Sequence, residues 1–233
     1  MPSTMGEKTF LDFYKNTILG YSKNLQKYIC TLLEQEGRIT FEEQRNLFDS
    51  NEKVYFESKK DFKKIIIETA TDIKFSNFYE KWEFIKLYKY SVPFFYKMPE
   101  GKDFQKLIEE KKITLFKDKE FKASYVISSS FKDATPLCMI KEEKIFLKFV
   151  LQKSFLTPNS YDRIDYRYPL VIYFDLKNSC LEVRYDSTKY SASFNNEVYE
   201  DIVNDCIEWL TRELGLILFD CDHNNIIDVV NDK

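Results

Sequence analysis

Glycine and histidine are scarce in this chain, and their scarcity removes support for several classes of site. Glycine accounts for 5 of the 233 residues, and neither glycine-rich phosphate-binding pattern, GxGxxG or GxxxxGK followed by Ser or Thr, occurs. His223 is the only histidine, so no metal centre built from several histidines can form. No serine or cysteine nucleophile motif accompanies it, which leaves triad catalysis unsupported. We therefore predict no cofactor and favour a protein that is not an enzyme.

The chain also lacks the cysteine pattern of a disulfide framework or a zinc site. Its cysteines are scattered and include no CxxC pair: Cys30, Cys138, Cys180, Cys206 and Cys221. An odd, irregular set without a signal peptide is typical of reduced thiols in a cytosolic protein. No apolar run approaches the roughly 18 residues that a transmembrane helix needs. These features predict a cytoplasmic protein with no membrane association.

Charge of one sign is not in large excess. The 35 basic and 38 acidic residues give a formal net charge of -3, so the molecule as a whole should not attract nucleic acid or an anionic membrane. Any binding of phosphates must therefore depend on a local basic surface. Aromatic residues are abundant, at 17% of the chain with 21 Phe and 16 Tyr, and they predict a core rich in aromatic side chains.

Helical periodicity dominates the first part of the chain, and strand-like runs dominate the second. Apolar residues spaced three and four apart predict amphipathic helices over about 9–20, 22–37, 40–48, 58–74, 77–90 and 103–112. Short β-rich runs begin at Ile113, and a last helix is expected over about 197–214. The pattern predicts an α+β fold: a helical N-terminal half followed by an antiparallel β-meander closed by a C-terminal helix. The predicted parts are residues 1–105 and 106–233.

Residues 22–74 hold a pattern similar to a known type of domain. A helix, the strand-like segment EGRIT, a short helix that starts at the capping box TFEE, a spacer and a further helix follow one another. This order resembles the start of winged helix-turn-helix domains, in which a short strand separates the first two helices. It departs from them in the spacer 49–57, which is long for a tight turn and lacks the usual glycine. The resemblance implies that the N-terminal helices contact nucleic acid.

The segment YPLVIYFDLKNSCLEVRYD, residues 168–186, has the pattern of two strands joined by a tight turn. Alternate residues of a strand share a face, so Phe174 and the other even-numbered residues form an apolar face that continues across the second strand. A turn at Asn178-Ser179 pairs Phe174 with Val183, whereas a turn at Lys177-Asn178 moves the pairing by two and keeps the same faces. The opposite face is polar, so we expect a packed core on one side of the sheet only.

Two carboxylates lie on the polar face of this hairpin. In the first register Asp175 and Glu182 are opposite each other, a pairing that normally destabilises a sheet unless a cation lies between them. With Arg184 two residues beyond, the spacing resembles the D…(D/E)xK core of metal-dependent nucleases, with arginine in place of the lysine. The alternatives are that the second register separates the carboxylates, or that Arg184 and water satisfy them. A metal-dependent nuclease or hydrolase is thus the rival functional hypothesis.

Residues 220–228, DCDHNNIID, resemble a calcium-binding loop of the EF-hand type. Asp220, Asp222 and Asn224 follow the spacing of its ligands. Asn225 stands where the loop needs glycine, and Asn231 stands where it needs a glutamate with two ligating oxygens. The alternative is a polar turn, and our primary prediction is that no metal is bound.

The last candidate is a set of lysines and aromatic residues in the helical half. Lysines on a helix edge can contact phosphates, and exposed aromatic rings can stack on bases. The predicted set comprises Lys59, Lys60, Lys63, Lys64, Lys89, Tyr90, Tyr96 and Lys97. The alternative is that the lysines are solvated and the aromatic rings are buried. We therefore predict a non-enzymatic binding component that contacts nucleic acid, or a protein partner in a larger assembly.

Overall fold

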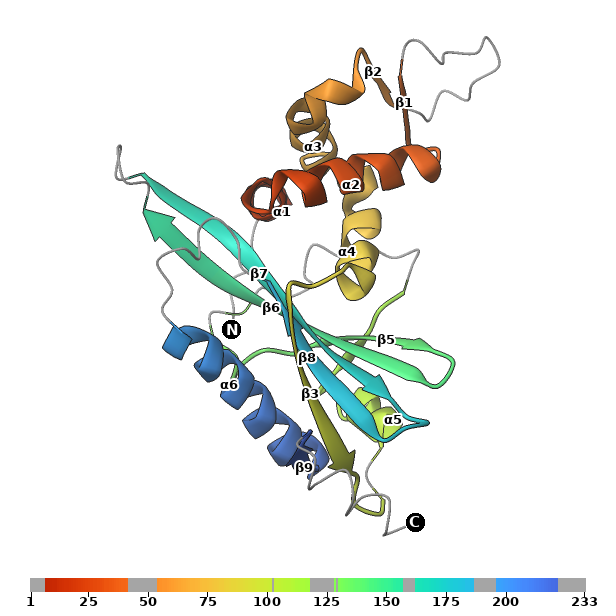
Figure 1. Cartoon of the computed structure of the whole chain (residues 1–233), viewed down its shortest axis with the longest axis vertical. Coiled ribbons are helices and arrows are strands. Elements are labelled where there is room, and N and C mark those ends of the chain that lie inside the picture. The colour runs from red at the N-terminus through yellow and green to blue at the C-terminus, as the bar shows by residue number, and fades with distance from the viewer. Residues whose placement is uncertain are drawn as a thin grey trace.

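The N-terminal part of the chain is helical, and the remainder forms a sheet with one long helix against it (Figure 1). This computed structural model describes residues 7–41, 54–101, 103–117, 128, 130–156, 162–186 and 196–221. The predicted α+β fold, with a helical N-terminal half, a β-meander and a C-terminal helix, is confirmed. No helix within these ranges is both long enough and apolar enough to cross a membrane.

Local sequence signals account for the ends of the helices. In chain order they are α1 (Glu7–Gly20), α2 (Lys23–Gln35), the 3-10 turn η2 (Lys59–Asp61), α3 (Phe62–Ala70), the 3-10 turn η3 (Ile73–Phe75), α4 (Ser76–Ile85), α5 (Phe104–Glu109) and α6 (Asn196–Leu214). Ser22 caps α2 because its hydroxyl accepts a hydrogen bond from the N–H of Leu25 at 3.3 Å. Gly37, with φ of 67°, follows its end in the left-handed conformation. The predicted helix over 40–48 falls almost wholly outside the described residues.

The helical part has its own aromatic core. Its buried side chains include Phe10, Tyr14, Phe78 and Trp82, together with Ile29 from the predicted stripe of α2. The strand expected near EGRIT is present as β1 (Ile39–Phe41). It pairs in parallel with β2 (Val54–Phe56), which lies inside the segment expected to be the spacer. The strand of the expected order is therefore present, whereas its parallel pairing with β2 was not predicted.

The second part of the chain builds the sheet. Its strands are β3 (Tyr90–Lys97), β4 (Thr114–Leu115), β5 (Leu137–Lys141), β6 (Lys144–Leu156), β7 (Arg163–Asp175), β8 (Cys180–Tyr185) and β9 (Ile217–Asp220). Among the described residues the strand order is β4-β5-β6-β7-β8-β3-β9, and every pair except the parallel β4-β5 is antiparallel. The β-rich runs expected at 145–152, 170–176 and 180–185 correspond to β6, β7 and β8, and the run expected at 113–116 contains β4. The sequence did not predict β5.

The helix expected over 77–90 ends at Ile85, and the strand β3, which follows it, was not predicted from the sequence. β3 lies in the sheet between β8 and β9. The chain therefore enters the sheet at β3, before residue 105. The other strands of the same sheet all come after residue 105. The division into residues 1–105 and 106–233 stays a prediction.

The hairpin of β7 and β8 adopts the second of the two predicted registers. Phe174 pairs with Leu181, and residues 176–179 form the turn. Asp175 is therefore opposite Cys180, while Glu182 is opposite Tyr173. The apolar face of even-numbered residues is confirmed, since Phe174 is fully buried in the main core of the sheet.

The expectation of a core on one side of the sheet only is wrong. Figure 1 shows α6 against one face of the sheet and the N-terminal helices at the other. On the α6 side, Trp209 and Leu210 pack into the main core. On the opposite side Val171 is fully buried in a smaller cluster with Phe84 of α4 and Phe146 of β6. The second face therefore includes a packed region beneath the helical part.

Candidate functional site

Part of the predicted lysine set lies on one exposed edge, which we call the lysine edge. It consists of Lys59 and Lys60 in η2 and Lys63 and Lys64 at the start of α3, all of them exposed. Ile65 and Ile66 are fully buried and hold α3 in the N-terminal core, so the lysines face solvent. Lys59 forms an ion pair with Glu34 at 2.7 Å. The other three form no ion pair with any residue that the structure describes.

The remaining members of the set do not join this edge. Lys89, just before β3, and Lys97, the last residue of β3, are both exposed, and eight residue steps along the strand separate them by roughly 26 Å. Figure 1 shows β3 running away from the helical part toward α5 and β9. Tyr96 is 9% exposed and packs edge-on against Phe174, with ring centroids 5.5 Å apart. The prediction of an exposed Tyr96 is therefore wrong, because the even-numbered residues at the end of β3 face the core.

The predicted catalytic carboxylate of Asp175 is used in the hairpin turn. It accepts hydrogen bonds from the backbone N–H groups of Lys177 and Asn178 at 3.1 and 3.2 Å, and from the Asn178 side chain at 2.9 Å. The Asn178 side chain is the main cause of the lowered pKa of Asp175, and the two backbone donors act in the same direction. These contacts explain the turn without a metal ion.

Glu182 and Arg184 form a local pair on the same face. Glu182 accepts hydrogen bonds from Arg184 and from Ser91 of β3, each at 2.8 Å. Burial raises the pKa of Glu182, but these two donors outweigh it and the pKa is lowered. Because the register separates Glu182 from Asp175, the predicted carboxylate pair does not face a shared site.

The calcium-loop candidate falls largely beyond the described residues. Asp220 is the last residue of β9 and pairs with Phe94 of β3, so it belongs to the sheet. Asp222 and Asn224 lie outside the residues that the structure describes. Within the described ranges, no group of three or more His, Cys, Asp or Glu side chains could hold a metal ion.

The most concentrated group of charges is buried between α4 and the sheet, and we call it the buried ionic cluster. Glu80 and Glu83 of α4 meet Lys148 of β6 and Arg167 of β7, and each is at most 1% exposed. Arg167 donates to both glutamates at 2.8 Å. Lys148 contacts Glu80 directly and donates to Glu83 at 3.1 Å. The ring centroid of Tyr14 from α1 lies 3.8 Å from the Arg167 guanidinium. These contacts join α1 and α4 of the helical part to β6 and β7 of the sheet.

Sequence reasoning did not find this cluster, although one signal for it exists. Lys148 stands between Phe146 and Val150 on one face of a strand, and both neighbours are buried. A lysine flanked in this way is either exposed at a sheet margin or paired with a buried acid. The acids are on a helix almost seventy residues away, so no local pattern identifies them.

Comparison with known proteins leaves the function to be argued from these residues, since the chain matches no protein-family model, no curated protein and no solved structure.

Proposed function

We propose that this protein is a non-enzymatic binding component that contacts nucleic acid through the lysine edge. The observation that carries the proposal is the exposure of four lysines within residues 59–64 beside a helix whose apolar residues are fully buried. Ammonium groups held in this way attract phosphates without reading the base sequence. Three of them form no ion pair with a described residue, although the exposed Asp61 stands between Lys60 and Lys63 in the sequence.

The small net charge of the chain sets the strength of such binding. At a formal charge of -3 the rest of the molecule contributes no attraction for a polyanion. Roughly three to five phosphates would be neutralised, so the affinity for duplex DNA should fall with salt at a log-log slope of about -3 to -5. The binding should therefore be weak and sensitive to salt.

The test is filter binding of duplex DNA across a salt series. Changing Lys59, Lys60, Lys63 and Lys64 to Gln should flatten the slope toward zero, because the changed groups are the phosphate contacts. The control changes four of the exposed lysines of the sheet part, Lys106, Lys132, Lys141 and Lys144, to Gln. It removes the same charge from the molecule and should leave the slope as it is. No binding at low salt, or equal slopes in the two variants, would contradict the proposal.

A protein partner is the second candidate. Tyr28 of α2 and Ile67 of α3 are 48% and 44% exposed, although both are large apolar residues on the helical part. Exposed apolar side chains can mark a protein interface when they form one patch. If the DNA measurements are negative, changing Tyr28 and Ile67 to Ser and measuring self-association by analytical ultracentrifugation would test the simplest partner, which is a second copy of the chain.

The nuclease hypothesis receives no support from the hairpin. Asp175 and Glu182 have separate hydrogen-bond partners and are not opposite each other. We therefore do not propose a hydrolytic activity.

A further inference from the structure

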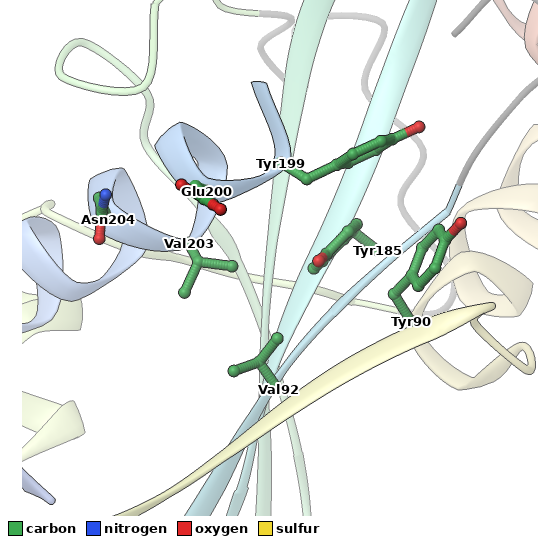
Figure 2. Close-up of a pocket in the computed structure, with 7 residues that line it drawn as sticks. All are labelled: Tyr90, Val92, Tyr185, Tyr199, Glu200, Val203 and Asn204. Carbon is green, nitrogen blue, oxygen red and sulfur yellow. The ribbon is translucent and has the colours of Figure 1, made fainter. Parts of the chain in front are cut away.

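A pocket with a cavity volume of about 600 Å³ lies between β3, the end of β8 and the first turns of α6 (Figure 2). Its volume is within the range of about 300–1,000 Å³ that is typical of small-molecule sites. It belongs to the sheet part of the molecule and contains none of the four residues of the lysine edge. The pocket is therefore a candidate site separate from the proposed nucleic-acid contact.

Three tyrosine rings make one wall of the pocket. The ring centroid of Tyr185 lies 5.3 Å from that of Tyr90 and 5.6 Å from that of Tyr199, and the two remaining rings are also 5.6 Å apart. Figure 2 shows the Tyr185 hydroxyl turned toward the side on which Val203 and Glu200 lie. Burial, with smaller contributions from Tyr90 and Tyr199, raises the pKa of Tyr185, so its phenol stays neutral at physiological pH.

The rest of the lining combines apolar surface with one negative charge. Val92 of β3 and Val203 of α6 supply the apolar surface, and Asn204 supplies an amide. Glu200 is the only charged residue among the described residues that line the pocket. It is exposed and forms no ion pair with the described part of the chain. An aromatic wall beside an unpaired carboxylate favours a cation.

The surroundings of the pocket strengthen this preference. Asp201 and Asp205 lie on the same turns of α6 as Glu200 and are exposed, but neither lines the pocket, and Lys153 partly offsets the charge of Asp205. Their negative charge attracts cations and repels phosphates. The Nζ atom of Lys89 lies 5.0 Å from the ring centroid of Tyr90, so this ring already contacts one ammonium group of the chain.

We propose that this pocket binds a small organic cation: an ammonium group attached to an apolar or aromatic body. The body packs against Tyr185, Val92 and Val203, and the ammonium group lies between the tyrosine rings and the carboxylate of Glu200. This site goes beyond the proposed nucleic-acid contact, since a phosphate chain and the acidic first turns of α6 repel each other.

The test uses three probes of similar shape that differ in charge: 2-phenylethylammonium, 2-phenylethanol and 3-phenylpropionate. Ligand-observed NMR titration of the full chain gives a Kd for each. We expect the ammonium probe to bind about 3- to 10-fold more tightly than the alcohol, the range that a cation–π contact and an exposed carboxylate supply. The carboxylate probe should bind most weakly. No saturable binding of the ammonium probe up to about 10 mM would overturn the proposal.

Variants of α6 assign the effect to the pocket. Glu200→Gln should reduce the preference for the ammonium probe over the alcohol by about 2- to 5-fold, because the carboxylate contact is lost while the cation–π contact remains. Glu208→Gln removes the same charge from the exposed surface of the same helix and should keep the preference. An unchanged preference in Glu200→Gln, or an equal loss in Glu208→Gln, would overturn the proposal. Glu200 is exposed, so its substitution does not endanger folding.

Discussion

A carboxylate such as that of Glu80, with no exposed surface, loses its hydration when the protein folds. That loss costs several kcal/mol unless partners of opposite charge are well placed. Burial alone raises the pKa of Glu80, but Arg167 and Lys148 outweigh it and the pKa is lowered. The buried ionic cluster is not fully satisfied, because Glu83 Oε1 and Arg167 Nε have no hydrogen-bond partner among the described residues. Our hypothesis is that the cluster fixes how α4 docks more than it adds stability.

The lowered pKa of Glu80 makes stability depend on pH in one direction. The folded state keeps this carboxylate ionised at pH values at which the unfolded chain, with a pKa near 4.5, takes up a proton. The contribution to stability is therefore complete above about pH 4.5 and is lost as the pH falls through the lower pKa of the folded state.

Glu80→Gln should lower the free energy of unfolding at pH 7 by about 3–5 kcal/mol, because it leaves two buried cations with one buried anion. It should also remove part of the stability loss below about pH 4.5, which urea titrations at pH 7 and pH 4 would measure. Glu68→Gln on the exposed face of α3 is the matched control and should change stability by less than about 0.5 kcal/mol.

A second substitution separates the charge effect from lost packing. Adding Lys148→Met to Glu80→Gln leaves one cation and one anion in the cluster, so the double variant should lose less stability than the sum of the two single losses. Additive losses would show that the four charges do not act as one network.

The periodicity of the sequence predicts the helices and strands, but it does not determine the register between neighbouring strands. Alternation identified the faces of β7 and β8, but a shift of two residues keeps both faces, so the register had to remain open. The turn decides it, because Asp175 accepts the N–H groups of Lys177 and Asn178, and Ser179 has φ of 52°. The candidate carboxylate pair depended on the other register, which is why it did not form.

β3 was not predicted, because Val92-Pro93 has the pattern of a helix end and was interpreted as the end of the helix expected over 77–90. The Tyr96 N–H donates to the carbonyl of Ser179, the turn residue just before β8, so alternate residues from Pro93 onward direct their nitrogen atoms to the other side of β3. β9 pairs with β3 only from Phe94 to Lys97 and does not reach Pro93. Pro93 therefore occupies a strand position at which no ladder bond to a described residue is lost.

Substitutions on the two faces of β7 test whether both are packed. Phe174→Ala should cost about 3–5 kcal/mol, because it leaves a cavity in the main core. Val171→Ala on the opposite face should cost about 1.5–3 kcal/mol, although a one-sided sheet would make it nearly neutral. Leu176→Ala, in the turn and 40% exposed, is the control. If urea titration gives Val171→Ala no larger effect than Leu176→Ala, the second face is not packed.

At the scale of the whole molecule, the helical part and the sheet are joined by buried contacts that the sequence does not reveal. Thr17 of α1 accepts the backbone N–H of Arg167 at 3.0 Å, and the Asn16 side chain donates to the Asp165 carbonyl at 2.8 Å. Because both side chains are polar, the sequence of α1 alone predicts that they contact solvent. A distant part of the chain supplies the surface that buries Thr17 and half-buries Asn16, and no periodic pattern carries that information.

Because these contacts cross between the parts, we expect the chain to unfold as one cooperative unit. The two tryptophans report on the parts separately: Trp82 lies in the N-terminal core, and Trp209 lies in the core of the sheet, where its ring centroid is 5.1 Å from that of Phe149. In the Trp209→Phe background, the fluorescence of Trp82 and the far-UV circular dichroism of the whole chain should give the same urea midpoint. Adding Phe174→Ala, a change confined to the sheet, should lower the Trp82 midpoint together with the circular dichroism midpoint. A Trp82 midpoint that does not move would show that the helical part unfolds independently of the sheet.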